Sequence, residues 1–585
     1  MAEIVGHQKA DKDFTVDFSK ILSFSKAHPH ILILLAFMLF GFYLRSYHMD
    51  FPVIGYHNMK ENQYIPYTEF MYNAEEFWDY FRTETYWIGA QQHGYFTQYE
   101  FPFIPWLILG LWWIFGIKLW AARLVIILFS VASIPMLYFV GKKLTDNLSL
   151  ILIACLFFTI MPISIFFGRN VQPEAPAVFL ILLGTYWFLC WREEVLAAVY
   201  QYKKFLCFSF SFLLVILLKI PNGIGLVPLL FFVPYKELFF RKKYLCTLAV
   251  LFIVIIAVFP VWVKFSQWVM PGAATVGTSG FSESFAEVRT NISLALSSSY
   301  WQDHYLGIRS FVLDNFTLWF FWLTVLGVFF AFFKLKTKVG LFLLGNFFSV
   351  LFYILFFADK FRGHAYYQMV FLPLVCLGSA YALYVFATIL EKPLMSLHFY
   401  KNFHGTLLLV FVVIFLFLSY SSLSAATARA FDVIFYGEDV IGDFINQNSQ
   451  PDERVFIDGV SSQSVGILWH AHRYGIDEIP ANLSRFQELE DILNFRWVVL
   501  YGPGISTVQT KPEIFDYIQN TYKIRYIGFI FQGGDQYTPF YYVLEKGGSV
   551  NASTLLLQTK VPYYVKTYDK TYEEIAVYAV DDLHE

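Results

Sequence analysis

The chain contains 585 residues, of which 57% are hydrophobic and only 15% are charged. Soluble globular proteins carry about 25% charged residues, so this composition excludes an ordinary soluble enzyme and indicates a protein that crosses a membrane many times. The net charge of −3 gives no sign of a nucleic-acid partner, and we expect none.

The N-terminal tail, residues 1–29, is polar and contains several lysines. The apolar span 31–47 follows without the small-residue cleavage site of a removable signal peptide, so we expect it to remain as an anchor. Lysines before a span favour the cytoplasmic side, and the tail is therefore predicted to be cytoplasmic.

Further apolar segments continue as far as residue 424. With the first span they total about eleven crossings, since a full crossing takes about 20 apolar residues. The predicted crossings after the first are 119–140, 148–167, 175–191, 205–218, 221–235, 245–264, 315–333, 339–357, 367–389 and 405–424.

One more segment, 103–116, is short and rich in tryptophan, which prefers the membrane interface. We expect a helix that lies on the membrane surface or re-enters it. When this segment is not counted as a crossing, every dense cluster of lysine and arginine falls on the cytoplasmic side, as the positive-inside rule requires. The exterior loops are then 48–118, 168–174, 219–223, 265–314 and 358–366. The loop 265–314 is long enough for a lid or for a segment without regular structure.

Residues 425–585 are polar and contain no span, so the C-terminal region is predicted to be an exterior soluble domain. Helices and strands alternate in its sequence pattern, which is typical of a small α/β domain. Helices are predicted at 438–448, 486–494 and 512–522, and strands at 454–458, 497–501, 524–531 and 540–544. The expected fold is therefore an α-helical polytopic membrane domain, 30–424, with juxtamembrane helices in its first exterior loop, followed by an α/β domain.

The first exterior loop carries several carboxylates among aromatic residues. A carboxylate held at a membrane surface is suited to take a proton from a hydroxyl group. The candidate catalytic residues are Glu61, in HNMKENQY, and Glu100, before a Phe-Pro turn. The alternatives are a solvated loop glutamate for Glu61 and a favourable charge at a helix N-terminus for Glu100.

The short exterior turn FFGRNVQPEAPA contains Arg169, Gln172 and Glu174. Charged groups at the mouth of a helical bundle usually pair with each other or face a polar cavity. An arginine fork can donate twice to a phosphate, whereas the structural alternative is an Arg169–Glu174 ion pair that closes the turn. Lys219 ends an apolar run, where it either meets a lipid phosphate or extends to the interface.

The densest polar group is ADKFRGHAYYQMVFLP, which contains Arg362, His364, Tyr366 and Tyr367 at the entry to a span. An interfacial aromatic belt explains the tyrosines alone but not the whole set. We therefore predict that these residues bind a phosphate or a sugar.

The order of these motifs resembles that of a known enzyme group. HNMKENQY follows the first span, and YEFPFIPWLILGLWWIFG, KLWAARLVIILFSVASIPMLYFVGKKL, ISIFFGRNVQPEAPAVF, LLKIPNG and HAYYQMVFLPL follow in turn. Over about residues 30–390 the chain resembles the GT-C membrane glycosyltransferases of the family that includes protein O-mannosyltransferases and the lipid A aminoarabinose transferase. The resemblance implies the GT-C fold. It also implies transfer of a sugar from a polyprenyl-phosphate carrier to a hydroxyl group of a protein, lipid or glycan.

The resemblance implies roles for single residues as well. Relatives commonly carry Asp-Glu in the first exterior loop, with an aromatic residue three positions after the Glu; here Glu61 and Tyr64 match, and Lys60 stands in the place of the Asp. Glu100 matches the acid before the proline turn. Some relatives use a divalent metal ion, but no residue here fixes one, and we expect no other cofactor. The residues expected to bind the donor phosphate and sugar are Lys60, Arg169, Gln172, Glu174, Lys219, Arg362, His364, Tyr366 and Tyr367, and Arg123 is expected to orient the surface helix.

Two other functional classes stay open. A transporter or flippase would use the intramembrane charges as a translocation path, although transporters usually show related halves and no repeat is visible here. A non-catalytic scaffold would use the exterior domain to bind a glycan or a protein. In the favoured interpretation the protein is an enzyme of the plasma (inner) membrane whose active site faces away from the cytoplasm.

Overall fold

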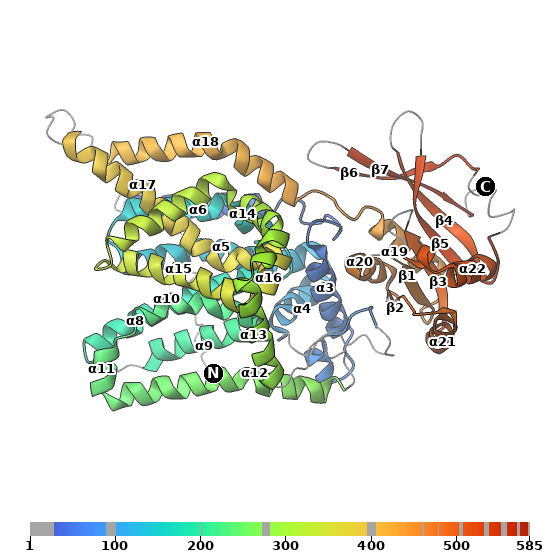
Figure 1. The fold of residues 1–585 in the computed structure, drawn as a ribbon, viewed down its shortest axis with the longest axis horizontal. Coiled ribbons are helices and arrows are strands. Elements are labelled where there is room, and N and C mark those ends of the chain that lie inside the picture. The colour runs from blue at the N-terminus through green and yellow to red at the C-terminus, as the bar shows by residue number, and fades with distance from the viewer. Residues whose placement is uncertain are drawn as a thin grey trace, which may run out of the picture.

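The computed structural model describes residues 28–88, 101–199, 202–271, 281–394, 405–458, 461–477, 479–501, 507–531, 537–550, 559–569 and 574–582. A large helical bundle forms one side of the molecule and a smaller domain with a β-sheet forms the other (Figure 1). Between them lie two helices of the first exterior loop, α3 (Asn58–Tyr72) and α4 (Phe103–Phe115).

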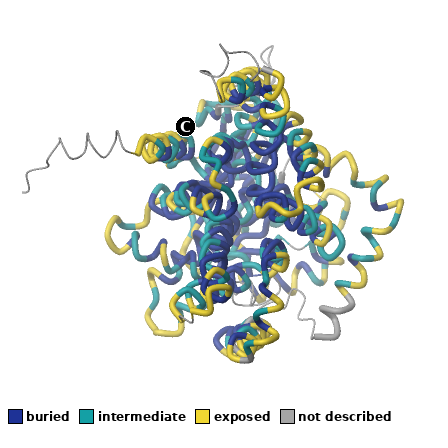
Figure 2. The backbone as a smooth tube through the Cα atoms, turned by 90° about the vertical axis from the view of Figure 1, so that its left-hand side faces the viewer, coloured by how far each residue is buried: buried dark blue, intermediate teal, exposed yellow. Residues whose placement is uncertain are grey.

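Seven helices in the described part of the chain are long and apolar enough to cross a membrane. Buried residues occupy the centre of the bundle, and exposed residues follow its outward faces (Figure 2). The exposed residues include large apolar side chains such as Phe252 and Phe417, which water would not tolerate over such an area but which a bilayer covers. The protein is an integral membrane protein. The seven helices are α5 (Leu119–Leu144), α8 (Glu174–Leu196), α12 (Lys242–Val269), α14 (Ser298–Phe332), α15 (Lys338–Phe356), η3–α17 (Ala365–Phe371 and Leu372–Leu394) and α18 (Thr406–Ala430).

Shorter helices complete the bundle, and one predicted crossing is divided among several of them. Residues 221–235 fall into a 3₁₀ helix, a single α-helical turn and the start of another helix. Prolines at 221, 228 and 234 explain the breaks, since each lacks a backbone N–H and disfavours a continuous helix. The total of about eleven crossings stays a prediction. The shorter helices are α2 (Pro29–Arg45), α6 (Leu148–Ile160), α7 (Pro162–Phe166), α9 (Tyr202–Leu218), η2 (Ile220–Leu226), α10 (Val227–Leu230) and α11 (Tyr235–Phe240).

The described part of the predicted exterior loop 265–314 is mostly helical. It contains α13 (Phe281–Leu296) and the first half of α14, which continues into the bundle. The two halves of α14 meet at Thr317, whose φ of 58° and ψ of 161° are not helical. A β-branched residue rarely adopts this conformation, so α14 carries local backbone strain at the end of the bundle that faces α3. The short helix α16 (Ala358–Gly363) and the 3₁₀ helix η3 lie beside it.

The C-terminal domain contains a seven-stranded sheet in the order β2-β1-β3-β5-β4-β7-β6. The pairs of β1 with β2 and with β3 are parallel, and the remaining pairs are antiparallel. The strands are β1 (Arg454–Asp458), β2 (Gly475–Ile476), β3 (Phe495–Tyr501), β4 (Tyr522–Phe531), β5 (Tyr537–Lys546), β6 (Tyr563–Asp569) and β7 (Glu574–Asp581). The helices are α19 (Glu438–Asn448), α20 (Ser461–Ala471), α21 (Leu483–Leu493) and α22 (Pro512–Thr521).

Alternate residues of the central strands face opposite layers of helices. Val455 and Trp497 join a core with α19 and α20, while Phe456 and Val498 join a core with α21 and α22. The domain is thus a three-layer α/β sandwich, which confirms the predicted class. The helix α20 and the strands β2, β6 and β7 were not predicted from the sequence.

The first exterior loop holds the two domains together. Glu69 of α3 accepts hydrogen bonds from Trp469 Nε1 and Tyr86 Oη, each at 3.2 Å, and pairs with His472 Nδ1 at 3.0 Å. Backbone bonds add to this contact, because the N–H groups of residues 434 and 435 both donate to the carbonyl of Ile54. The position of the α/β domain therefore depends on residues 54–88.

We expect docking of the C-terminal domain to weaken as the pH rises through and above the range in which an ordinary histidine titrates. The hydrogen bond to Glu69 raises the pKa of His472 despite partial burial, so His472⁺ contributes to docking at lower pH and loses this contribution as the pH rises through its raised pKa. The protection of α20 against hydrogen exchange, which is the intrinsic exchange rate at each pH divided by the measured rate, should decrease across this pH range. The variant His472→Gln should remove the pH dependence; an unchanged pH dependence in that variant would contradict the assignment.

Candidate active site

The carboxylate of Glu61 lies near the start of α3, where that helix meets the start of α5 and the turn between α7 and α8. Arg123 donates to it through Nε at 2.7 Å and Nη2 at 2.9 Å, one bond to each oxygen. The backbone N–H of Val171 donates to the same carboxylate at 3.3 Å. The side chain of Glu61 is only 4% exposed and that of Arg123 only 1%. The pair is therefore bidentate, buried and fixed in orientation.

Burial alone would raise the pKa of Glu61, but its neighbours outweigh that effect. The charge and hydrogen bonds of Arg123, the nearby charge of Arg169 and the N–H of Val171 together lower the pKa. Glu61 is consequently ionised, and in this arrangement it is a poor acceptor for a further proton.

Arg123 and Arg169 also donate hydrogen bonds to the backbone of the segment that follows α2. Arg123 Nη1 donates to the carbonyls of His48 at 3.1 Å and Phe51 at 2.6 Å. Arg169 Nη1 donates to the carbonyls of Tyr47 and, at 2.9 Å, His48. The two arginines thus fix the path of the first exterior loop before α3 begins.

A second group of side chains, here called the Lys219 cluster, comprises His57, Lys219, His364, Tyr366 and Tyr367. Lys219 Nζ lies 4.5 Å and 4.2 Å from the ring centroids of Tyr366 and Tyr367. The ring of His364 stacks on Tyr366 at 5.0 Å, and His57 lies 5.5 Å from His364. Three distant segments of the chain therefore meet here, and sequence reasoning had picked out all of these residues except His57.

The Lys219 cluster borders buried polar groups that lack partners. Glu174, the first residue of α8, pairs with Lys219 through one oxygen, and its other oxygen has no hydrogen-bond partner among the described residues. The amide of Gln172 is fully buried, and neither of its polar atoms has a partner in the same part of the chain. Because buried polar groups are nearly always satisfied, these atoms indicate a place for a ligand or for water.

Both histidines of the Lys219 cluster resist protonation. Burial is the main cause that lowers the pKa of His57 to about 3 and of His364 to about 4, and the positive charge of Lys219 adds to both shifts. Lys60 and Lys360 lower the pKa of His364 further. Burial disfavours any charge here, but the part of the shifts that comes from the lysines reflects a positive potential, which favours an anion.

Other predicted residues lie around these two groups. Lys60 Nζ donates to Gln63 Oε1 at 3.0 Å. Arg362 donates to Asp359 Oδ1 at 2.6 and 3.0 Å and contacts His304 Nε2 at 2.5 Å, so its described partners belong to α16 and α14.

Two further predictions concern the first exterior loop. Tyr64 is buried in α3, with its ring 5.6 Å from that of Tyr67. Glu100 lies outside the described residues.

No three His, Cys, Asp or Glu side chains in the described ranges converge into a group that could hold a metal ion.

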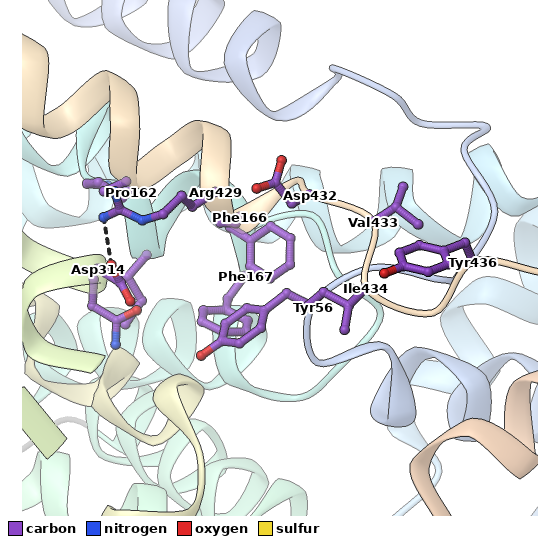
Figure 3. Close-up of a pocket in the computed structure, with 14 residues that line it drawn as sticks. Tyr56, Pro162, Phe166, Phe167, Asp314, Arg429, Asp432, Val433, Ile434 and Tyr436 are labelled. Carbon is purple, nitrogen blue, oxygen red and sulfur yellow. Dashed lines mark hydrogen bonds and ion pairs between the residues drawn. The ribbon is translucent and has the colours of Figure 1, made fainter. Parts of the chain in front are cut away.

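A cavity of about 340 Å³ lies next to both groups, between α7, α14 and α18 (Figure 3). Phe167 forms part of its wall and also contacts the Lys219 cluster, since its ring is 5.8 Å from His57 and 6.0 Å from Tyr366. Sequence reasoning gave no role to the polar residues of this cavity. Its lining includes Tyr56, Phe166, Phe167, Asp314, Asn315, Arg429, Asp432 and Tyr436.

Two solved membrane enzymes share this fold. The archaeal oligosaccharyltransferase AglB from Archaeoglobus fulgidus, in complex with an inhibitory peptide and a dolichol-phosphate, superposes with a TM-score of 0.56 at 14% identity, covering 88% of this chain and 74% of that chain. ArnT from Cupriavidus metallidurans, bound to undecaprenyl phosphate, gives a TM-score of 0.51 at 12% identity, covering 94% of this chain and 98% of that chain. At such identities the likeness establishes the fold.

The sequence itself supplies the enzyme class. The family described as dolichyl-phosphate-mannose-protein mannosyltransferase matches residues 100–263, which include α4, α5, the Arg169 turn and Lys219. The chain has the GT-C fold and is a membrane glycosyltransferase. No curated protein sequence matches this glycosyltransferase. The predicted superfamily, fold class and enzyme class are thereby confirmed.

Sequence reasoning missed His57, Asp314 and Arg429 of the glycosyltransferase. His57 is the first residue of HNMKENQY and directly precedes α3, and its αL backbone, with φ of 53°, carries no sequence signal for a non-glycine residue. In the sequence, Asp314 and Arg429 are charged residues next to the ends of two apolar spans, where paired or solvated charges are common. Only the packing of α14 against α18 brings these two residues together, at 2.7 Å.

Proposed function

We propose that this glycosyltransferase transfers a sugar from a polyprenyl-phosphate carrier to an acceptor hydroxyl group, on the extracytoplasmic face of the plasma (inner) membrane. The observation that carries the proposal is the Lys219 cluster, in which a lysine, two histidines and two tyrosines face one another beside unsatisfied buried polar atoms. A phosphate diester is an anion with several acceptor oxygens, which matches these groups.

The related structures support a lipid-linked substrate. AglB was solved with a dolichol-phosphate and ArnT with undecaprenyl phosphate. This chain offers an apolar groove of about 830 Å³ between α2, α6 and α18, lined by residues such as Tyr43, Leu156 and Leu423. The groove and the cavity of Figure 3 share Asp432 in their linings, so the groove lies beside the polar site.

In the proposed reaction the acceptor oxygen attacks the anomeric carbon in a single displacement, and the polyprenyl phosphate leaves. Lys219 stabilises the negative charge that develops on the leaving phosphate. His364, Tyr366 and Tyr367 donate hydrogen bonds to the phosphate or the sugar, and His57 joins them. The proposal also includes the other residues that the sequence predicts to bind the donor phosphate and sugar: Lys60, Arg169, Gln172, Glu174 and Arg362.

Glu61 remains a residue that we expect turnover to require, together with Glu100. The bidentate contact with Arg123 favours a positioning role for Glu61, because both oxygens already accept hydrogen bonds and the side chain is closed to solvent. By holding Arg123, Glu61 fixes the start of α5 against the first exterior loop, and with it the distance to the Lys219 cluster.

The extracytoplasmic placement rests on charge and on domain arrangement. The clusters Lys142-Lys143 and Lys334–Lys338 meet at the C-terminal end of α5, where Lys338 Nζ donates to the carbonyl of Lys143 at 3.3 Å. Helix α3 meets the opposite end of α5 through Glu61 and Arg123, and in Figure 1 it lies on the side of the α/β domain. The Lys219 cluster and residues 425–585 then share the exterior side. The α/β domain is proposed to recognise the acceptor or a partner at that face.

Replacing Lys219 with Gln should weaken the binding of undecaprenyl phosphate, used as the probe, about ten- to a hundredfold. A hydrogen bond to a charged group contributes about 1.5–3 kcal/mol, and about 1.4 kcal/mol corresponds to a factor of ten. Binding to the purified full-length chain in nanodiscs would be measured by native mass spectrometry. Since Lys219→Gln leaves Glu174 without its partner, the double variant Lys219→Gln/Glu174→Gln keeps the site neutral.

The matched control is Lys236→Gln, at an exposed lysine of α11. It should bind the probe as tightly as the wild type. If Lys219→Gln and the double variant both retain wild-type affinity, the phosphate does not bind at the Lys219 cluster. Mass spectrometry of glycolipids and glycoproteins from a strain that lacks the gene would then identify the product class and test the transfer itself.

A further inference from the structure

A base must touch the acceptor hydroxyl group in order to remove its proton. The carboxylate of Glu61 cannot do so in this structure, because it is 4% exposed and accepts three hydrogen bonds. At the position where relatives carry an Asp, this chain has Lys60. The proposed transfer therefore needs a carboxylate that is open to a cavity beside the Lys219 cluster.

Asp314 meets this requirement. Its side chain is 36% exposed and lines the cavity of about 340 Å³. Arg429 Nη2 donates to Oδ1 at 2.7 Å and Ser310 Oγ donates to Oδ2 at 3.2 Å. An ionised carboxylate offers about four lone-pair positions, so each oxygen keeps one for another donor. Arg429 supplies a counter-charge to this carboxylate and fixes its orientation in the cavity wall.

The cavity lies directly beside the proposed phosphate site. Phe167 borders both sites, because it lines the cavity and its ring centroid lies 6.0 Å from that of Tyr366. Asn315, the residue after Asp314, donates from Nδ2 to the carbonyl of Ala365 and to Gln368 Oε1, each at 2.9 Å. These bonds tie the helix that carries Asp314 to the segment that carries the Lys219 cluster.

The chemistry of the cavity matches a sugar ring. Phe166, Phe167 and Tyr56 lie between the Asp314–Arg429 pair on one side and Tyr436 on the other (Figure 3). Flat apolar rings suit the C–H faces of a pyranose, whereas carboxylate, amide and guanidinium groups suit its hydroxyl groups. The aromatic residues are Tyr56, Phe166, Phe167 and Tyr436.

A strained backbone position lies close to Asp314. Thr317, one turn further along α14, adopts φ of 58° and ψ of 161°, a region used almost only by glycine. Its side chain is buried, and its hydroxyl group has no hydrogen-bond partner among the described residues. Backbone strain of this kind persists where the surrounding structure fixes the conformation, and it is common at functional sites. Here the strained residue lies between the two halves of α14, close to the cavity.

We propose that this cavity binds a sugar unit of the acceptor and that Asp314 is the base that removes the proton from its hydroxyl group. The inference rests on the proposed glycosyl transfer. The proton passes from the acceptor oxygen to the Asp314 carboxylate, and an electron pair of that oxygen forms the new bond to the anomeric carbon. The bond between the anomeric carbon and the phosphate oxygen breaks, and its electron pair stays on the polyprenyl phosphate. Asp314 then returns its proton to solvent.

The test compares Asp314→Asn with Asp303→Asn, an exposed aspartate of the same helix. Each full-length variant would be expressed in the strain that lacks the gene, and the new glycoside would be quantified by mass spectrometry of glycolipid and glycoprotein fractions. Undecaprenyl phosphate binding to the purified variants would be measured alongside. Asp314→Asn should lower turnover about 10²- to 10⁴-fold, the usual contribution of a general base, with unchanged binding of the probe. Asp303→Asn should behave as the wild type, and Asp314→Glu should restore part of the turnover.

The outcomes separate this inference from the proposed function. If the wild-type chain forms no glycoside, the proposed transfer itself is wrong. If the wild type is active and Asp314→Asn matches Asp303→Asn, Asp314 is not the base. Equal losses of turnover and probe binding in Asp314→Asn would assign it a structural role and overturn the inference. A new sugar attached to a protein side chain, and not to another sugar, would overturn the assignment of the cavity to a sugar acceptor.

Discussion

Replacing Arg123 with Met should lower the free energy of unfolding by about 3–5 kcal/mol, because it leaves the buried carboxylate of Glu61 without a counter-charge. Arg123 is 1% exposed and supplies two hydrogen bonds to Glu61 as well as bonds to three backbone carbonyls of the first exterior loop. The midpoint of thermal unfolding of the purified chain in detergent would measure the loss. Turnover should fall with it, since the loop that carries His57 would lose its anchor.

A matched control uses an exposed ion pair. Arg485 contacts Glu488 at 2.8 Å, with side chains 42% and 55% exposed, so Arg485→Met should change stability by about 0–1 kcal/mol. The double variant Arg123→Met/Glu61→Leu removes both buried charges and should recover part of the stability without recovering turnover. A double variant less stable than Arg123→Met alone would contradict an uncompensated charge as the cause.

Replacing Gly168 with Ala should prevent the wild-type packing of the turn before Arg169. A Cβ at this position would overlap the carbonyl oxygen of Ser164 and the hydroxyl group of Ser130, and would lie 2.9 Å from Arg45 Nε. Overpacking a rigid site costs about 1–3 kcal/mol, and loss of hydrogen bonds at a buried charge adds about 1–3 kcal/mol. We therefore expect a destabilisation of about 3 kcal/mol or more, measured by the thermal midpoint.

The expected loss of stability in Gly168→Ala depends on the surroundings of Arg45. This side chain is fully buried and donates to Ser130 Oγ at 2.7 Å and Ser164 Oγ at 2.6 Å, so it has no room to move aside. Gly307→Ala is the control, because no atom lies within 4 Å of a Cβ built there and Ala favours an α-helix over Gly by about 1 kcal/mol. Equal thermal midpoints for the two variants would show that the turn is not tightly packed.

The parts of the candidate site that could be predicted are those with an unusual local composition. Glu174, Lys219, His364, Tyr366 and Tyr367 stand out as polar residues at the ends of apolar runs, and the structure brings them together. Their placement there is costly unless they pair or face a polar cavity, which is why such residues can be selected without a structure.

Residues without an unusual local context could not be predicted. Asp314 and Arg429 lie 115 positions apart, and each is an ordinary charge at the end of a span until α14 and α18 pack together. The helix α3 shows the same limit, because it is polar around most of its surface and has no apolar stripe that would predict its burial. It is buried because α4 covers one side and α20 covers another.

The sequence by itself determined the membrane class, the apolar helices, the alternating pattern of the α/β domain and the superfamily, since hydropathy, side-chain period and motif order are properties of neighbouring residues. The tertiary structure alone decided that Arg123 occupies both oxygens of Glu61, that His57 joins the Lys219 cluster, and that Asp314 opens to a cavity. These pairings join residues that are distant in the chain. Their geometry follows from how whole helices pack, which local sequence patterns do not encode.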